Sequence, residues 1–264
     1  MSTTDRSPDE LWVCHLGVVP YPDALAIQEH VRGRRQAGEV ADTLLLLEHP
    51  SVYTRGRRSG AEDLPFGGEF YRARGIDVVD TDRGGRITYH GPGQLVGYPI
   101  MAIGDVHRHL RTMEAAIVAA LAEEGIDACS RREEGIDYTG VWVEDRKIAS
   151  IGVHVSRGVT THGFAVNVHN DLEPFSWVIA CGLPEISMTS IAAESAGACR
   201  PGSDRPLLCF RRRMAHSFCE AHARRQRLVS PQRLGIATPH AAGPAVERAP
   251  IGSIPLRHAT PMPV

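Results

Sequence analysis

The stretch GVWVEDRKIASIGVHVSRGVTTHGFAVNV, residues 140–168, decides the fold class of this 264-residue chain. It holds three runs of strand-forming residues, at 140–143, 147–155 and 161–168. Polar turns of three residues, Glu144-Asp145-Arg146 and Ser156-Arg157-Gly158, separate the runs. Strands joined by turns this short pair antiparallel with their neighbours. The stretch therefore predicts an antiparallel meander.

The residues on either side predict further strands and three helices. Apolar periodicity predicts helices at 23–35, from Asp105 to Gly125, and at 206–225. Short strand-like runs lie at 43–48, 76–79, 86–89 and 95–103. The strands cluster, with the helices grouped between clusters, and no regular βαβ alternation occurs. We expect an α+β fold in which flanking helices cover a mixed, largely antiparallel sheet.

One folded domain accounts for most of the chain, at 9–228. Apolar residues make up 42% and charged residues 23%, as in ordinary soluble proteins. Residues 1–8 are polar, and we expect a flexible N-terminal tail. After Phe218 no aromatic residue occurs, and seven prolines follow Ser230. Such a segment gains too little from burial to offset its ordering entropy, so we expect a disordered, Pro-rich tail at 229–264.

Charge and hydropathy exclude several classes of partner. The net charge is -2, so nothing favours general binding to nucleic acid. No apolar run is long enough to span a membrane, and the polar N-terminus does not resemble a secretory signal. We expect a cytoplasmic monomer that has no nucleic-acid or membrane partner. Its six cysteines form no CxxC pair, so we expect free thiols and no metal site.

Lys147 is the only lysine among 29 basic residues. A guanidinium stays protonated at any useful pH, whereas a desolvated amine can lose its proton and act as a base. In an extended strand Lys147 shares one face with Ala149, Ile151, Val153 and Val155, which surrounds it with apolar groups. Because Lys147 directly follows a turn, it can instead point into water. A catalytic base and a solvated surface charge are both open interpretations.

A glycine-rich segment, RGGRITYHGPGQLVGYP at 83–99, joins two predicted strands. Its five glycines allow main chain to approach a ligand closely, because no Cβ intervenes. Tyr89, His90 and Gln94 add polar side chains. The spacing does not match a phosphate loop of the GxxxxGK type. The segment predicts either a ligand-binding loop or a structural turn.

Cys181 is the candidate nucleophile. It precedes Gly182 after an apolar stretch, and this position predicts an accessible thiol beside backbone N–H groups that can receive an oxyanion. A buried structural thiol is the alternative, since free cysteines are among the most buried residues.

Three segments, taken together and in order, resemble the octanoyltransferase family of lipoate biosynthesis, also called lipoyl(octanoyl) transferases. They are RGGRITYHGPGQLVGYP, then KIASIG with the following THGFAVNV and DL, and ACG followed by TS. The similarity runs from about Trp12 to Ile191. It implies the fold of the biotin and lipoate protein ligase catalytic domain.

The resemblance also implies an activity, its partners and its site residues. The expected reaction, the first step of endogenous protein lipoylation, moves an octanoyl group from acyl carrier protein to a lysine of a lipoyl domain without a cofactor. The implied acceptors are lipoyl domains of 2-oxoacid dehydrogenase complexes and the glycine cleavage H protein. The acyl-thioester cysteine falls on Cys181, and the general base that lowers the pKa of that cysteine falls on Lys147. The substrate-contacting residues fall on Arg83, Gly84, Gly85, Arg86, Ile87, Thr88, Tyr89, His90, Ser150, Ile151, Gly152, Gly163, Phe164 and Ala165. Ala180 departs from the family, which commonly has proline there.

Two other functions remain open at this point. An ATP-dependent lipoate or biotin ligase on the same fold needs no nucleophilic thiol. A catalytically silent module that only binds a carrier protein needs neither the thiol nor the amine. A basic cluster is equally open, as a docking patch for an acidic carrier or as a solvated surface; its members are Arg55, Arg57, Arg58, Arg72 and Arg74.

Overall fold

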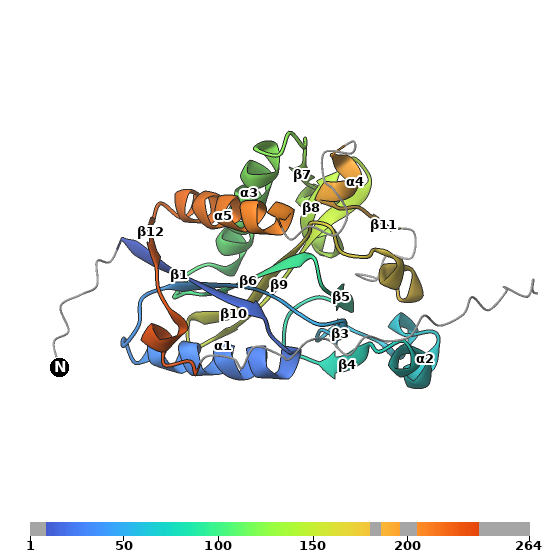
Figure 1. The fold of residues 1–264 in the computed structure, drawn as a ribbon, viewed down its shortest axis with the longest axis horizontal. Coiled ribbons are helices and arrows are strands. Elements are labelled where there is room, and N and C mark those ends of the chain that lie inside the picture. The colour runs from blue at the N-terminus through green and yellow to red at the C-terminus, as the bar shows by residue number, and fades with distance from the viewer. Residues whose placement is uncertain (1–8, 180–185, 196–204, 238–264) are drawn as a thin grey trace, which may run out of the picture.

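One mixed sheet forms the centre of the molecule, with helices on both sides (Figure 1). The structure is a computed structural model that describes residues 9–179, 186–195 and 205–237. In spatial order, the strands of the main sheet are β12 (Arg225–Leu228), β1 (Glu10–Val18), β2 (Thr43–Glu48), β6 (Gln94–Ile100), β10 (Val159–Asn167), β9 (Arg146–Ser156), β8 (Gly140–Val143) and β7 (Cys129–Ser130), with β11 (Ser187–Met188) beside β9. A second sheet contains β4 (Asp77–Asp80), β3 (Val52–Arg55) and β5 (Thr88–His90).

Strand directions in the main sheet confirm the expected fold class. From β2 through β6, β10, β9 and β8 to β7, every neighbouring pair is antiparallel. Only the short β11 and the edge made by β1, β2 and β12 add parallel pairs. The predicted meander is present as β8, β9 and β10. The fold is therefore α+β with a mixed, largely antiparallel sheet.

The three predicted helices are present, as α1 (Tyr21–Gln36), α3 (Val106–Ala122) and α5 (Arg205–Ala221). The carboxylate of Asp105 caps α3 by accepting the backbone N–H groups of His107 and Arg108, at 2.8 and 3.1 Å. The last helix was expected to reach Arg225, but it ends at Ala221. A positive φ of 51° at Ala223 turns the chain into β12. Two short helices, α2 (Gly67–Ala73) and α4 (Ile191–Glu194), were not predicted.

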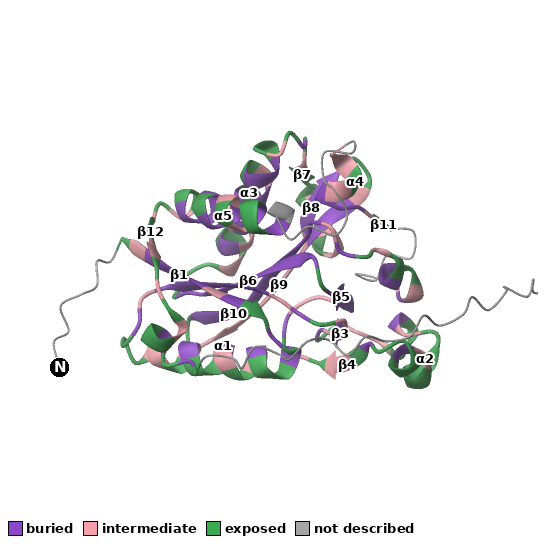
Figure 2. Cartoon of the chain, in the orientation of Figure 1, coloured by how far each residue is buried: buried purple, intermediate pink, exposed green. Residues whose placement is uncertain are grey.

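Both faces of the sheet are buried (Figure 2). Helices α3 and α5 cover one face through Met113, Ile117, Phe210 and Phe218. Helix α1 covers the other face, where strand residues such as Trp12 meet Ala24 and Val31. Because helices cover both faces, β2 carries four consecutive leucines at 44–47, each at most 2% exposed. In the described part of the chain, no helix is long and apolar enough to cross a membrane.

The folded part extends past the boundary expected at residue 228. Pro231–Leu234 forms a 3-10 helix, and the side chain of Leu234 is fully buried. Leu234 and Ile236 pack with Trp12 and Val31 in the core beneath the sheet. Burial of these two apolar side chains stabilises the segment despite its proline. The prediction that the tail begins at 229 is therefore wrong, because the folded part continues beyond this residue. Most of the predicted tail, 238–264, lies outside the described residues, as does 1–8.

Buried histidines make the stability of the fold depend on pH. Burial lowers the pKa of His49 and His109 to about 4, from an ordinary value of 6.5. The unfolded chain binds a proton at each near pH 6.5, whereas the folded protein does so only near pH 4. The contribution of these two histidines to the free energy of unfolding is therefore fully present above pH 6.5. It is lost progressively as the pH falls toward 4. We expect a loss of up to about 1.4 kcal/mol per pH unit for each histidine, measured by urea unfolding between pH 7 and 5.

Replacing one of these histidines tests this pH dependence. His109 lies buried on α3, and its Nε2 has no hydrogen-bond partner among the described residues. His109→Leu should reduce the slope of the free energy of unfolding against pH by the amount that one titrating histidine contributes. Met113→Leu, on the same buried helix face, is the matched packing control and should leave the slope unchanged. An identical slope in His109→Leu and wild type would contradict the assignment.

Candidate active site

A cavity of about 390 Å³ opens beside β9 and β10, and residues of two of the segments singled out in the sequence line it, the glycine-rich segment and KIASIG with the following THGFAVNV. The glycine-rich segment forms one wall, and the two strands form another. Helix α1 contributes Tyr21, and α3 contributes Val106 and Leu110. Segments from four distant parts of the chain therefore enclose one space.

Most of the predicted substrate-binding residues line this cavity. They are Arg83, Gly84, Gly85, Arg86, Ile87, Thr88, His90, Ser150, Ile151, Gly152, Gly163, Phe164 and Ala165. Tyr89 does not, because side chains alternate along β5 and Tyr89 points away from Thr88 and His90. Its ring packs against Tyr53 and Phe175, and its hydroxyl lies 3.0 Å from Ser51 Oγ.

Arg83 supports the wall of the cavity. Its side chain is buried, and Nε donates to Thr54 Oγ1 at 3.1 Å. One terminal nitrogen donates to the carbonyl oxygen of Thr54 at 2.5 Å, and the other to that of Gly84 at 3.0 Å. The guanidinium thus joins β3 to the glycine turn. The sequence pattern identified the residue but not this supporting role.

The glycine turn packs directly on β9. The N–H of Gly84 donates to the carbonyl of Val153 at 3.0 Å. A Cβ on Gly152 would lie 2.8 Å from the carbonyl oxygen of Gly84. Gly152 therefore admits the turn, and this close approach of backbones explains one glycine that the sequence alone assigned to ligand contact.

Lys147 is buried in the cavity wall, with 2% of its surface exposed. Its Nζ lies 5.1 Å from the centre of the Trp142 ring, and its Cε passes close to Gly140. A side chain on Gly140 would place a Cβ 2.7 Å from that Cε. Glu114, buried on α3, accepts the N–H of Gly140 at 3.1 Å and so fixes the backbone that borders the lysine. Of the two interpretations, the structure supports the desolvated lysine rather than the solvated surface charge.

A β-bulge changes the predicted face of Lys147. Trp142 pairs with Lys147 but Val141 pairs with Ala149, so Ile148 is an extra residue in β9. Strict alternation was expected to place Lys147 on the face of Ala149. Instead Lys147 lines the cavity together with Ser150, whereas Ile148 and Ala149 belong to the core.

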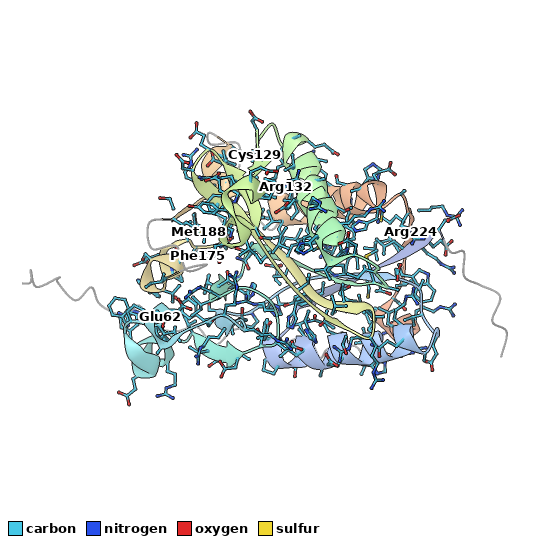
Figure 3. All side chains as sticks on the ribbon, turned by 180° about the vertical axis from the view of Figure 1, so that it is seen from behind. Glu62, Cys129, Arg132, Phe175, Met188 and Arg224 are labelled. Carbon is cyan, nitrogen blue, oxygen red and sulfur yellow. The ribbon has the colours of Figure 1, made fainter. Side chains whose placement is uncertain are left out.

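Cys181 and Ala180 lie outside the described residues. Described residues flank them on both sides: the N–H of Ile179 donates to the carbonyl of Asp63 at 3.1 Å, and Met188 in β11 pairs with Lys147 in β9. Phe175 and Met188, labelled in Figure 3, lie together at one end of the molecule.

The buried part of the cavity lining contains residues that the sequence analysis did not name individually. Tyr21, Tyr98 and His162 belong to it, and each is at most 3% exposed. Asp82 accepts a hydrogen bond from His162 Nε2 at 2.7 Å, and its other oxygen lies 3.3 Å from His154 Nε2. Burial is the first cause that lowers the pKa of His162. Tyr98 and His162 lie within the quoted segments at 83–99 and 161–168, which could have identified them, whereas Tyr21 at the start of α1 carries no such signal.

The mouth of the cavity is polar and exposed. Arg57, Arg58, His107 and Ile136 line it, and Arg58 forms an ion pair of 2.8 Å with Asp137 across it. Of the basic cluster expected from the sequence, only Arg57 and Arg58 belong to this rim. Arg55 instead pairs with Asp80, at 3.2 Å.

The reactive group that this cavity offers is the buried amine of Lys147. In the part of the chain that the structure describes, no three His, Cys, Asp or Glu side chains are grouped to hold a metal ion. Apolar side chains, including Ile87, Ile151 and Phe164, line the cavity together with a buried lysine. Such a site can hold a hydrocarbon chain and present an amine to one end of it.

Fold and family comparisons define the class of protein. Lipoate-protein ligase A bound with ATP superposes with a TM-score of 0.68 at 17% identity, covering 86% of this chain and 92% of that one. The ligase of a bipartite lipoylation system from Thermoplasma acidophilum gives a TM-score of 0.63 at 18% identity, covering 86% and 89%. The model of the lipoyl protein ligase A/B catalytic domain matches residues 20–201. The domain is thus of the lipoyl protein ligase A/B class, which confirms the expected fold.

Similarity to curated proteins identifies the family within the lipoyl protein ligase A/B class. The octanoyltransferase of Solibacter usitatus is 48% identical over 182 residues, which cover 67% of this chain and 80% of that protein. That of Rubrobacter xylanophilus is 44% identical over 208 residues, covering 77% and 90%. The chain belongs to the octanoyltransferase family, and it is an acyltransferase that acts in octanoyl transfer for lipoylation.

Proposed function

We propose that the protein takes an octanoyl group from acyl carrier protein onto the thiol of Cys181 and passes it to a lysine of a lipoyl domain. The acceptors in this proposal are the lipoyl domains of 2-oxoacid dehydrogenase complexes and the glycine cleavage H protein. The observation that carries it is the position of the chain's only lysine, buried in the wall of a cavity that two of the three family segments line. Membership of the octanoyltransferase family supports the acyl group.

In the first half-reaction, the amine of Lys147 takes the proton of the Cys181 thiol. The thiolate attacks the thioester carbonyl of the donor, and backbone N–H groups stabilise the oxyanion. A carbon–sulfur bond to Cys181 forms as the bond to the carrier's pantetheine sulfur breaks. The departing thiolate recovers the proton from the Lys147 ammonium, and an acyl-enzyme remains.

In the second half-reaction, the lysine amine of the lipoyl domain attacks the Cys181 thioester. Lys147 accepts a proton from the attacking nitrogen as the carbon–nitrogen bond forms. The carbon–sulfur bond breaks, and the Cys181 sulfur takes the proton back. Formation of an amide from a thioester runs downhill, so the proposed cycle uses neither ATP nor a metal ion.

The described flanks of Cys181 support its proposed position. Met188, seven residues after Cys181, pairs with Lys147, and the N–H of Thr189 donates to the Lys147 carbonyl at 3.0 Å. Asn167 donates to the Thr189 carbonyl at 2.9 Å and accepts from Gln94 at 2.9 Å. This hydrogen-bonded chain holds the segment after residue 185 against the lysine and the cavity wall.

Incubation with octanoyl carrier protein tests the thioester. We expect intact mass spectrometry to show a single octanoyl adduct on wild type that hydroxylamine removes, because thioesters are labile to this reagent. Cys181→Ala should form no adduct and lose octanoyl transfer to a lipoyl domain. Cys129→Ala is the matched control, since Cys129 is an exposed thiol away from the cavity, and it should retain both.

Other outcomes identify the alternatives. Carrier binding without any adduct would indicate a silent binding module. Transfer that requires ATP and persists in Cys181→Ala would indicate a ligase that works through an adenylate. Either result would overturn the proposed function.

A further inference from the structure

Four polar aromatic residues lie together in the buried part of the cavity lining. They are Tyr21, His90, Tyr98 and His162, each at most 6% exposed, and we refer to these four as the aromatic end wall. The ring of Tyr21 stacks on that of His90, with centroids 5.9 Å apart. The rings of Tyr98 and His162 meet edge to face at 6.4 Å. The wall thus presents ring surfaces to the cavity.

Hydrogen bonds to neighbouring groups satisfy the polar atoms of the aromatic end wall. His162 Nε2 donates to the Asp82 carboxylate at 2.7 Å, so Nδ1 is left to accept the Tyr21 hydroxyl at 3.4 Å. His49 Nδ1 donates to the Val19 carbonyl at 2.6 Å, so its Nε2 accepts the hydroxyl of Tyr98 at 2.7 Å. His90 Nδ1 bonds to Gln94 at 2.8 Å. A hydrocarbon can therefore contact this wall without stripping a hydrogen bond from it.

The backbone of His162 is held in an uncommon conformation. Its φ is +56°, and among the described residues the other non-glycine positions with positive φ are Glu144, Arg157 and Ala223. Those three lie in turns, whereas His162 lies buried within β10. Its N–H donates to the buried side chain of Gln28 on α1, at 2.6 Å. A strained conformation that the surroundings fix in this way is typical of a functional position.

We propose that the aromatic end wall sets the longest acyl chain that the enzyme accepts. In this proposal Tyr21 determines specificity, and Asp82 is a positioning residue that acts through His162. The inference rests on the proposed function, in which a carrier protein delivers the chain. A folded carrier must stay at the exposed rim of Arg57, Arg58 and Ile136, so the methyl end enters first and points toward the buried wall.

An acyl chain longer than the cavity can enter only if the aromatic end wall moves, and this movement breaks contacts and hydrogen bonds. To admit further methylenes, Tyr21 must leave His90 and give up its bond to His162. His162 cannot follow it, because Asp82 holds its ring at Nε2 and the Gln28 side chain holds its backbone N–H. The energetic cost therefore falls on chains longer than the cavity and leaves shorter chains unaffected.

A chain-length profile tests this inference. The specificity constant kcat/KM is measured for octanoyl, decanoyl and dodecanoyl carrier proteins. In Tyr21→Ala we expect the ratio of dodecanoyl to octanoyl to rise at least about tenfold. Asp82→Ala should shift the ratio the same way by a smaller factor, because Tyr21 stays but His162 loses its anchor. Asp82 is exposed, so this second variant is expected to fold even if Tyr21→Ala does not.

Tyr71→Ala is the matched control. Tyr71 is another fully buried tyrosine, but it packs with Tyr53 and Phe70 outside the cavity. Its replacement should lower stability and act equally on all chain lengths, leaving the ratio unchanged. An unchanged ratio in both Tyr21→Ala and Asp82→Ala, with an acyl adduct still formed, would overturn the end-wall inference alone. Absence of the adduct in wild type would instead overturn the proposed function.

Discussion

Lys147→Arg will keep the fold and lose at least about 100-fold in steady-state octanoyl transfer. An arginine at this position retains the positive charge and can attract a thiolate. It cannot accept a proton from Cys181 or from the acceptor amine, because a guanidinium stays protonated. The measurement is turnover with octanoyl carrier protein and a lipoyl domain, with circular dichroism and thermal unfolding to confirm the fold.

Two further variants separate proton transfer from size. Lys147→Met keeps much of the volume of the buried stem and removes the amine, and it should lose as much turnover as Lys147→Arg. Arg146→Lys is the control for the exchange itself, since Arg146 lies next along β9 with a partly exposed side chain that pairs with Glu144 and Glu194. This variant should remain fully active. Wild-type rates from Lys147→Arg would refute the role of Lys147 as a base.

Gly140→Ala will lower octanoyl transfer by at least about tenfold and destabilise the fold by about 1–3 kcal/mol. Gly140 has φ of +138°, which side chains disfavour, and it lies against Lys147. A Cβ there would lie 2.4 Å from the carbonyl oxygen of Ala149 and 2.7 Å from Lys147 Cε. Strand β8 must move away from β9, and the amine moves with the adjusted backbone. Turnover and urea unfolding measure the two effects.

Gly158→Ala controls for backbone strain without crowding. Gly158 also has a positive φ, of 75°, but nothing lies within 4 Å of its added Cβ. It occupies the turn between β9 and β10, far along the strand from Lys147. We expect this variant to lose some stability and keep full activity. Full activity in Gly140→Ala would show that the glycine does not position the lysine.

Many of the helices and strands could be predicted from local patterns in the sequence. Strand β2 has the predicted bounds, and the meander differs from its prediction by at most two residues at any strand end, because alternation and short turns are local signals. Strands β1, β3, β7, β11 and β12 were missed. Strand β12 follows a helix after a three-residue turn and is built from polar residues, RQRL, so only its pairing with β1 reveals it.

The site was predicted in part for the same reason. Arg83–His90, Ser150–Gly152 and Gly163–Ala165 carry dense local motifs, and most of these residues line one cavity. The bulge at Ile148 was not predictable, because it depends on how β8 pairs with β9. The partners of His162 come from α1 and from the turn before the glycine-rich segment. Long-range contacts of this kind leave no periodic signal in the chain.

In the proposed function, the burial of Lys147 also protects the only lysine of the protein from acylation by the carrier-bound donor. In the proposed reaction, a reactive acyl thioester forms at every turnover and its acyl chain is passed to an amine. Of the 29 lysine and arginine residues, all but Lys147 are arginines, which are poor acyl acceptors, and the single lysine is buried. The outer surface consequently offers stray acyl groups no lysine amine, so in the proposed reaction no lysine of the protein competes with the acceptor.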